Sequence, residues 1–369
     1  MADRSIPEHD VKFTLISYHL RSSLALRSGS VHTLVHDTHP QGSLGNVHLQ
    51  VVATPVSIDD IRAARTRLVG IAVRTPLVRF PADGGASEVY LKLENLQPIG
   101  SFKLRGAANA MALAGSDALS HGVYTASAGN MAQGVAWCAR ELGVRCRVVV
   151  PEHAPKTKTD AIERLGGEVI RVPFDEWWQT LVNRGHPGMD GFFVHPFADN
   201  AVMAGNGTIG LEIFEDLADV DAIIVPYGGG GLACGIAAAA RAISPRTKVY
   251  AVEVETAAPL TASLAAGVPT PVTRTQTFID GMGSGAVFGE MWPLVQSLLA
   301  GTIVVSVAQI AAAVKTLAER CRVVAEGAGA APLAAALTGV LEGQKTVCIV
   351  SGGNIDLDKF ATILRGDIP

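Results

Sequence analysis

Lys103 is a candidate for covalent chemistry because it lies at the predicted start of a helix. The segment from Asn95 to Ala107 contains it and separates a predicted strand ending near Leu93 from an Ala-rich helix. A cation near the positive end of a helix is mildly disfavoured, and partial burial lowers the pKa of an amine. These conditions suit a lysine that forms a Schiff base. On this segment alone, a solvated lysine in a first helical turn is the simpler interpretation.

Four successive glycines, Gly228 to Gly231, follow a buried apolar strand and open a predicted helix from Leu232 to Arg241. Glycines lack a Cβ, so successive N–H groups can approach an anion, and the helix N-terminus adds a favourable dipole. The segment therefore predicts a phosphate site. A glycine-rich turn needed only for packing is the alternative.

The same glycines also fit a dinucleotide-binding pattern. Gly228, Gly230 and Ala233 match G-x-G-x-x-A, and the acidic Glu253 ends the next predicted strand. This pattern is typical of an NAD-dependent oxidoreductase. Four successive glycines exceed what a pyrophosphate turn requires, and a dinucleotide site gives no role to the other loops.

Two further loops also follow predicted strands. The segment Ser127–Gln133 opens a helix, so its free N–H groups could hold a substrate carboxylate, while Asn130 could simply be an N-cap. The segment Ser351–Asn354 ends the last apolar strand, where a tight turn is the structural alternative. Each alternative is plausible when its loop is taken alone.

The elements that must position these loops alternate between strands and helices. Such alternation predicts an α/β fold with right-handed crossovers and largely parallel sheets, in which ligands bind at the carboxyl ends of strands. The predicted strands are Val89–Leu93, Gly122–Thr125, Cys146–Val150, Glu168–Val172, Ala222–Val225, Val249–Val252 and Val347–Val350.

Charge and composition narrow the class of partner. Thirty Lys and Arg against thirty-four Asp and Glu give a formal charge of −4, which does not indicate binding to nucleic acid or to an anionic membrane. No apolar run approaches the roughly 20 residues that span a bilayer, and the start lacks the pattern of a secretory signal. We therefore expect a cytoplasmic protein with a small-molecule partner and reduced core cysteines, namely Cys138, Cys146, Cys234, Cys321 and Cys348.

Folded structure is predicted to begin near Ser57, where Ser57-Ile-Asp-Asp60 matches a helix capping box. Residues 1–50 are expected to form an N-terminal extension, with disorder as one interpretation of it. Their six histidines have irregular spacing, which favours a solvated arm over a metal-binding tract. The six are His9, His19, His32, His36, His39 and His48.

Taken together and in this order, the loops resemble the threonine dehydratase and serine racemase family of pyridoxal-phosphate enzymes. The resemblance runs roughly from Val56 to the C-terminus and rests on five motifs. They are Lys92–Ala107, Ser127–Gly134, His195–Phe197 with Ala204–Thr208, Pro226–Leu232, and Ser351–Asn354.

The resemblance implies a two-lobed fold like that of the tryptophan synthase β subunit, known as fold type II, with parallel-rich sheets flanked by helices. It implies a large cofactor-binding domain of residues 51–118 and 199–369, and a small domain of residues 119–198. A homodimer or homotetramer is also expected.

Site roles follow from the resemblance residue by residue. Lys103 would be the catalytic residue and hold pyridoxal 5'-phosphate as a Schiff base, and Phe102 would lie against the pyridine ring. Asn130 would bond the phenolic oxygen, and Ser351 would face the pyridine nitrogen. Substrate would contact Ser127, Ala128, Gly129 and Met131, and the phosphate would be held by Gly228, Gly229, Gly230, Gly231 and Leu232.

The implied reaction is loss of water from a β-hydroxy amino acid, giving a 2-keto acid and ammonia, with Lys103 as the base at Cα. Racemases of this family carry a serine where Ala128 lies, so the sequence favours a dehydratase over an amino-acid racemase. The racemase-type cation site matches Glu253, Ala257 and Pro259, and proline cannot replace its aspartate, so no metal is predicted.

Two further residues differ from the family pattern. Many members have His where Met131 lies, and Asn206 replaces a glutamine. If Met131 lines the pocket, its apolar, adaptable side chain favours a substrate larger or more apolar than threonine, for example a β-aryl-serine such as phenylserine. The alternative is that Met131 only packs beneath the loop. Glu326 aligns with a family glutamate near the site, but as a first-turn helix carboxylate it is left out of the catalytic set.

Overall fold

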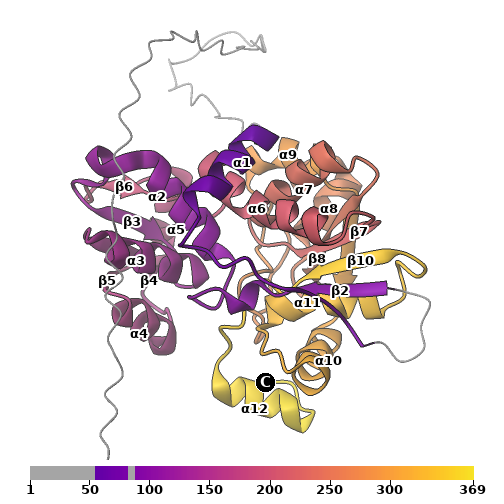
Figure 1. Cartoon of the computed structure of the whole chain (residues 1–369). Helices are drawn as coiled ribbons and strands as arrows, with labels where there is room; N and C mark the ends of the chain where they lie inside the picture. Colours follow the sequence, from indigo (N-terminus) through magenta and orange to yellow (C-terminus); the bar gives the residue numbers. More distant parts are fainter. Residues whose placement is uncertain (1–54, 82–87) are drawn as a thin grey trace, which may run out of the picture. The chain divides into compact units, whose positions relative to one another are not determined.

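The computed structural model describes residues 55–81 and 88–369 (Figure 1). The predicted N-terminal extension, its six histidines and residues 51–54 of the predicted large domain lie outside this range. The helices are α1 (Ile58–Arg67), α2 (Lys103–Leu119), α3 (Asn130–Leu142), α4 (Lys156–Arg164), α5 (Phe174–Val182), α6 (Asn200–Asp216), α7 (Gly231–Ile243), α8 (Pro259–Ala266), α9 (Trp292–Leu298), α10 (Val307–Thr316), α11 (Gly327–Leu337) and α12 (Leu357–Arg365), with the short turns η1 (Glu94–Leu96), η2 (Gly289–Met291) and η3 (Leu317–Cys321). The strands are β1 (Leu77–Arg79), β2 (Glu88–Lys92), β3 (Val123–Ala126), β4 (Cys146–Pro151), β5 (Gly167–Val172), β6 (Phe192–Phe193), β7 (Ala222–Pro226), β8 (Lys248–Val254), β9 (Gly301–Val305) and β10 (Lys345–Ile349).

The capping box at the start of α1 is confirmed. The Ser57 hydroxyl accepts a hydrogen bond from the Asp60 N–H at 3.1 Å, and the Asp60 carboxylate accepts one from the Ser57 N–H at 3.0 Å. The reciprocal pair satisfies two N–H groups at the helix start, so α1 begins at Ile58. Ile61 is then fully buried.

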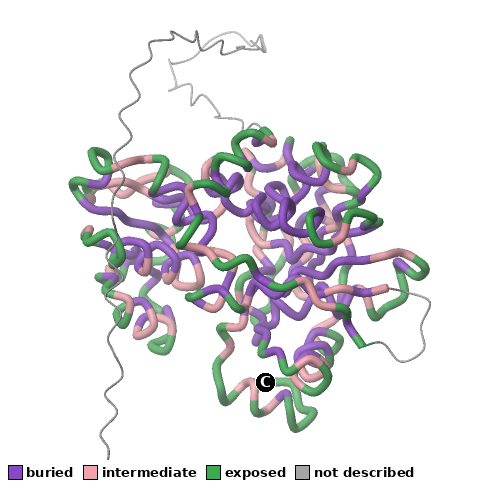
Figure 2. The backbone as a smooth tube through the Cα atoms, viewed as in Figure 1, coloured by how far each residue is buried: buried purple, intermediate pink, exposed green. Residues whose placement is uncertain are grey.

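A six-stranded sheet has the order β1-β2-β10-β7-β8-β9. Its pairs are parallel except for the edge pair of β1 with β2, in which Leu77 lies opposite Lys92. Side chains alternate along β7. Ile223 and Val225 pack with residues of α6 and α7, and Ile224 packs with residues of α10 and α11. Helices therefore cover both faces of this sheet (Figures 1 and 2), as a parallel sheet requires.

A second sheet has the order β5-β4-β3-β6, and all its pairs are parallel. Its four strands lie between Val123 and Phe193, and α2 and α3 pack against it. We propose residues 119–198 as the small domain that the sequence predicted. The predicted α/β fold with two largely parallel sheets is confirmed.

The seven predicted strands all occur, with ends that differ from the predicted ones by at most two residues. Three observed strands were not predicted. β6 has two residues and β1 has three, so neither shows a period of two, and β9 is an edge strand that starts at Gly301. The glycine-containing segments 185–188 and 267–277 are loops without helix or strand.

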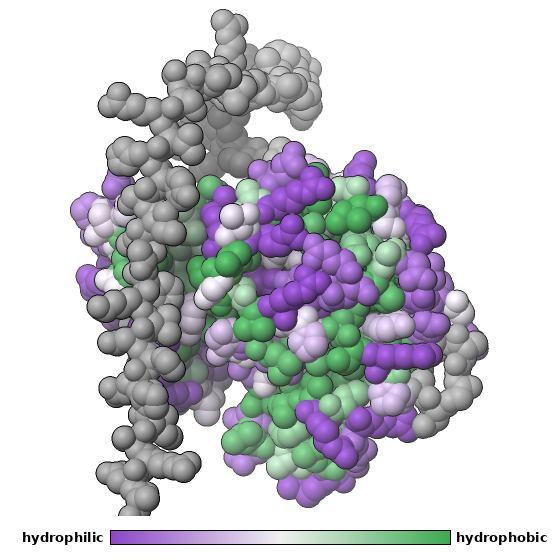
Figure 3. Space-filling view, viewed as in Figure 1, coloured by the Kyte–Doolittle hydropathy of each residue, from purple (hydrophilic) through white to green (hydrophobic). Residues whose placement is uncertain are grey.

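No helix in the described part of the chain is both long enough and apolar enough to cross a membrane. The face shown in the space-filling view mixes polar and apolar side chains (Figure 3).

The backbones of α2, α6 and α7 approach closely because glycines lie at their contacts. A Cβ on Gly205 of α6 would lie 2.4 Å from the Arg105 carbonyl oxygen of α2, and one on Gly235 of α7 would lie 2.4 Å from the Met203 carbonyl oxygen. Any larger residue would push these helices apart. The helix α2, which starts with Lys103, therefore packs directly against α6.

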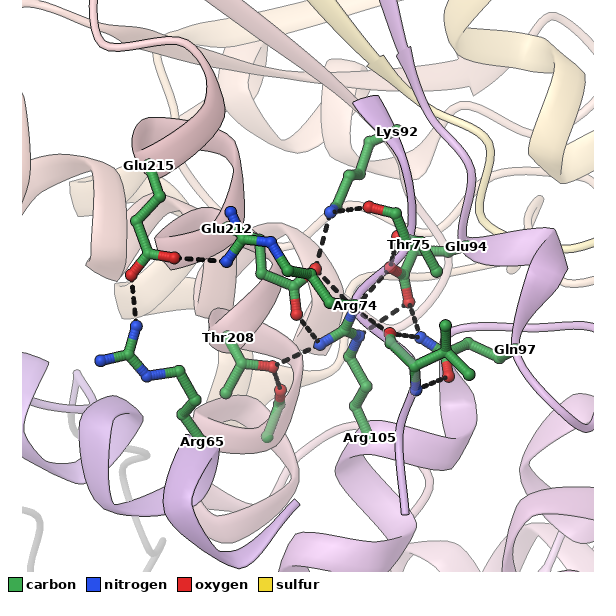
Figure 4. A network of polar contacts seen from close by, with 12 residues as sticks. Arg65, Arg74, Thr75, Lys92, Glu94, Gln97, Arg105, Thr208, Glu212 and Glu215 are labelled. Atoms are coloured by element: carbon green, nitrogen blue, oxygen red, sulfur yellow. Dashed lines mark hydrogen bonds and ion pairs between the residues drawn. The ribbon is translucent and has the colours of Figure 1, made fainter. Parts of the chain in front are cut away.

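A buried cluster of ion pairs joins α2 to β2, η1 and α6 (Figure 4). Arg105 donates two hydrogen bonds to Glu94 at 2.8 Å each, and two to Glu212 at 2.6 and 2.9 Å. Lys92 of β2 donates to Glu212 and to the Thr75 carbonyl oxygen, both at 2.6 Å. Two cations and two carboxylates balance each other, and all four side chains are almost fully buried.

The charges in this cluster depend on one another. Burial by itself raises the pKa of Glu94, but the charge and hydrogen bonds of Arg105 outweigh it and hold the pKa below its ordinary value. The Thr75 hydroxyl and the Gln97 amide also donate to Glu94. A buried ion pair of this kind adds little net stability, but losing one partner leaves an uncompensated charge.

Arg105→Leu is therefore expected to destabilise the protein by about 3–5 kcal/mol, because Glu94 and Glu212 lose their main partner. The matched control is Arg74→Leu. Arg74 also pairs with two carboxylates, Glu215 and Asp216, but its side chain is half exposed, so its loss should cost less than about 1 kcal/mol. Urea unfolding followed by circular dichroism measures both, and equal losses would contradict the role given to burial.

Candidate active site

A cavity of about 370 Å³ lies where the loops after β3, β7 and β10 meet the start of α2. The structure brings all of the sequence-predicted site residues to its lining. These are Phe102, Lys103, Ser127, Ala128, Gly129, Asn130, Met131, Gly228, Gly229, Gly230, Gly231, Leu232 and Ser351. Loops that each had a structural alternative in the sequence therefore form one site.

Lys103 is the first residue of α2, and its side chain lies against the cavity instead of extending into bulk solvent. Its Nζ donates a hydrogen bond of 2.6 Å to the Pro196 carbonyl oxygen and lies 5.2 Å from the centroid of the Phe102 ring. Burial lowers the pKa of the amine to about 8, against a smaller raising effect of the Glu326 charge. The lowered pKa raises the neutral fraction of Lys103 near neutral pH far above that of an ordinary lysine, and the neutral amine can act as a nucleophile or base.

The loop before Lys103 is fixed to the end of β10. The Phe102 N–H donates to the Ser351 carbonyl oxygen at 3.0 Å, and Ser101 pairs with Gly352 in an isolated β-bridge. Ser351 is buried and lines the cavity. The backbone hydrogen bond between Phe102 and Ser351 therefore fixes Ser351 close to Lys103, the residue after Phe102.

The glycine loop combines tight packing with an open helix end. Gly230 has φ of +88°, and a Cβ on Gly229 would lie 2.2 Å from the Phe197 ring. Both positions therefore require glycine for structural reasons. α7 begins at Gly231, so the first N–H groups of that helix lack intrahelical partners and lie at the cavity. The packing role is thus observed, and the phosphate-binding role that the sequence predicted falls on the same loop.

Asn130 is not the N-cap that the sequence allowed. Gly129 occupies that position, and Asn130 is the first residue of α3. The Asn130 amide donates to Glu326 at 2.8 Å, and its carbonyl oxygen accepts from Asn354 at 2.8 Å. Because Asn354 also donates to the Ile99 carbonyl oxygen, the orientation of the Asn130 side chain is determined at both ends. Among the described residues, Glu326 is the acceptor for the Asn130 amide, so the second N–H of that amide is available to a ligand.

Glu326, which the sequence analysis left out of the catalytic set, lies at the centre of the site's polar contacts. It lies at the cavity, its side chain is buried, and burial raises the pKa of its carboxyl to about 8 even though Asn130 lowers it by hydrogen bonding. The signal in the sequence was a single carboxylate within an Ala-Gly segment, Ala325 to Ala330. Such a charge is expected to be buried with the apolar residues around it.

Glu253 has a different role from the one that a dinucleotide site requires. Its carboxylate accepts hydrogen bonds from the Leu260 N–H at 2.9 Å, the Thr261 N–H at 2.7 Å and the Thr261 hydroxyl at 2.6 Å. It therefore caps the start of α8, and it is not part of the cavity lining.

Comparison with known families gives the same assignment as the geometry. The family model described as "Pyridoxal-phosphate dependent enzyme" matches residues 70–352. The chain belongs to this family. Within it, the relatives below show the threonine dehydratase and serine racemase group, so the cofactor is pyridoxal 5'-phosphate and the oxidoreductase alternative is wrong.

Similar proteins support this placement. An L-threonine ammonia-lyase of Thermotoga maritima is 40% identical over 317 residues, covering 84% of this chain and 78% of the relative. The catabolic L-threonine dehydratase TdcB of Escherichia coli K12 is also 40% identical and covers 84% of this chain and 96% of the relative. The solved structure of maize serine racemase has a TM-score of 0.78 at 33% identity, with 85% of this chain and 98% of the other covered.

The residues of this pyridoxal-phosphate enzyme fit the cofactor on geometric grounds. The cavity offers a buried amine with a lowered pKa, a glycine loop at a helix N-terminus for the phosphate, and a hydroxyl at the opposite loop. The individual contacts predicted for Phe102, Asn130 and Ser351 remain our proposals.

Because burial lowers the pKa of Lys103 to about 8, the neutral amine fraction rises through that pH. Apoenzyme mixed with pyridoxal phosphate should therefore bind it covalently at a rate that increases with pH and levels off about one unit above this pKa. Stopped-flow absorbance measures the rate. A rate that keeps increasing up to the ordinary lysine pKa of 10.5 would contradict the assignment.

Proposed function

We propose that this enzyme removes water from a β-hydroxy amino acid such as threonine or serine and releases a 2-keto acid and ammonia. The observation that carries the proposal is the setting of Lys103, whose amine has a pKa of about 8 and reaches into the same cavity as the glycine loop. Relatives named threonine ammonia-lyase and threonine dehydratase, each 40% identical, support the choice of reaction.

Bound pyridoxal phosphate withdraws electrons from Cα of a substrate and so makes the Cα proton acidic. Lys103 would take this proton, since its lowered pKa makes the neutral form far more populated at neutral pH than in an ordinary lysine. The N–H groups at the start of α3, in the segment Ser127–Asn130, would hold the substrate carboxylate. Ser351 offers a neutral hydroxyl where a carboxylate would enforce a protonated ring, and this favours prompt elimination.

Glu326 is proposed as a positioning residue. Its hydrogen bond with Asn130 fixes the amide that the cofactor is expected to contact, and its raised pKa keeps much of the carboxyl neutral near pH 7. A neutral carboxyl beside Lys103 does not hold the lysine in its charged form. The predicted oligomeric state, a homodimer or homotetramer, and the predicted cytoplasmic location stay predictions.

The direct test is incubation of the holoenzyme with L-threonine and L-serine. Equal amounts of 2-keto acid and ammonia are expected, and Lys103→Ala should reduce the rate by at least about a thousandfold because it removes both the covalent anchor and the base. Lys156→Ala is a matched control, since that lysine is 83% exposed and pairs only with Asp160 among the described residues. No keto acid from any β-hydroxy amino acid would overturn the proposal.

Ala128 should determine the choice between elimination and racemisation, because it offers no proton on the face of Cα opposite Lys103. Ala128→Ser would place a hydroxyl there. The variant is expected to produce D-serine from L-serine at a measurable rate, whereas the wild type produces little. Chiral chromatography of the remaining serine checks this, and efficient racemisation by the wild type would contradict it.

A further inference from the structure

An aromatic surface forms one side of the active-site cavity. We call Trp177, Trp178, Phe197 and Phe288 the aromatic wall, and all four line the cavity. Trp177 and Trp178 belong to α5, Phe197 follows the Pro196 carbonyl group, and Phe288 precedes η2. Three segments far apart in the sequence therefore contribute rings to one surface.

The rings of the wall hold one another in place. Phe288 contacts Phe197 with centroids 5.3 Å apart and an interplanar angle of 84°, and it contacts Trp178 at 6.0 Å and 72°. The buried His195 ring lies 4.6 Å from Phe197 and 5.7 Å from Phe288. Edge-to-face contacts at these distances are favourable, so the wall is fixed and does not need a ligand to order it.

The wall starts beside the reacting amine. Lys103 Nζ donates to the Pro196 carbonyl oxygen, and the next residue, Phe197, packs against Gly229 of the proposed phosphate loop. From Phe197 the rings continue through Phe288 to Trp178. A substrate held at Lys103 would therefore have aromatic edges and faces available to the group on its Cβ.

The remaining lining strengthens the apolar character of this region. Met131, Leu181 and Met282 also reach the cavity, and methionine adapts readily to an aromatic ring. Of the charged groups at the lining, Lys158 and Asp280 pair with each other at 2.9 Å. Arg274 is exposed, and it offers the alternative of a substrate with a second carboxylate.

We infer that the preferred substrate carries an aromatic group on Cβ, so that the site takes β-aryl-serines ahead of threonine and serine. This inference rests on the proposed dehydration and adds the substrate class. With β-phenylserine, the Cα–H and Cβ–O bonds break and water leaves. The enamine that is released gains a proton at Cβ and is hydrolysed, giving phenylpyruvate and ammonia without an oxidant.

The test compares kcat/KM of the holoenzyme for L-serine, L-threonine, the threo and erythro forms of L-β-phenylserine, and L-threo-β-hydroxyaspartate. We expect kcat/KM for one phenylserine form to exceed that for threonine by at least about tenfold. The phenyl ring would bury apolar surface against the aromatic wall, whereas the methyl group of threonine would leave most of that surface uncovered. Equal or higher values for threonine, serine or hydroxyaspartate would overturn the inference and leave the dehydratase proposal intact. No keto acid from any of them would instead remove the proposed function.

Two variants locate the preference. Trp178→Ala should lower the ratio of phenylserine to threonine kcat/KM by about tenfold, because a ring contact with the substrate is lost. Trp292→Ala is the matched control: this tryptophan starts α9, does not line the cavity, and should leave the ratio unchanged. An unchanged ratio in Trp178→Ala would overturn the role of the wall.

Binding of an unreactive amino acid gives a readout that does not depend on turnover. L-Phenylalanine has the ring but no β-hydroxyl to lose, and L-2-aminobutyrate is the small counterpart. Titration calorimetry of the holoenzyme should give a Kd at least about tenfold lower for phenylalanine. Equal Kd values would contradict an aromatic wall that binds the substrate.

Discussion

The position of Lys103 depends on the buried ion pairs of Arg105, two residues further along α2. Arg105 binds Glu94 just after β2 and Glu212 of α6, so the strand, the reactive loop and two helices share one charge-balanced cluster. Such a cluster contributes more to geometry than to stability, because each buried charge loses its hydration. A displaced α2 would leave one of the carboxylates without its partner, and this makes alternative placements of Lys103 costly.

Burial acts on the two titratable groups of the active site in opposite directions. It lowers the pKa of the Lys103 amine and raises the pKa of the Glu326 carboxyl, each to about 8. Both changes favour the neutral form, since a low-dielectric setting penalises charge of either sign. Burial at the cavity therefore increases the neutral fraction of the Lys103 amine and weakens the anion beside it. Asn130, bonded to Glu326, links this effect to the loop at the start of α3.

Parts of this arrangement could be predicted from the sequence, and others could not. Strands such as β7 and β10 are buried on both faces, so they appear as short unbroken apolar runs, whereas β6 is too short to show any pattern. Loops that follow such strands were expected to bind the ligand, and the loops after β3, β7 and β10 do line one cavity between the two sheets' strand ends. The roles of Lys92 and Arg105 were not evident, because their partner Glu212 is more than one hundred residues away. Trp177 and Trp178 resemble core residues of an amphipathic helix in the sequence, and only the fold shows that both line the cavity, where Trp178 contacts Phe288.

The central claim is that Lys103 is the residue that holds the cofactor. Reduction of the holoenzyme with borohydride fixes the cofactor to its lysine, and proteolysis with mass spectrometry then identifies the modified peptide. The predicted result is a pyridoxyl group on Lys103 alone. Modification of Lys158, the other lysine at the cavity lining, or of the buried Lys92 would contradict the claim.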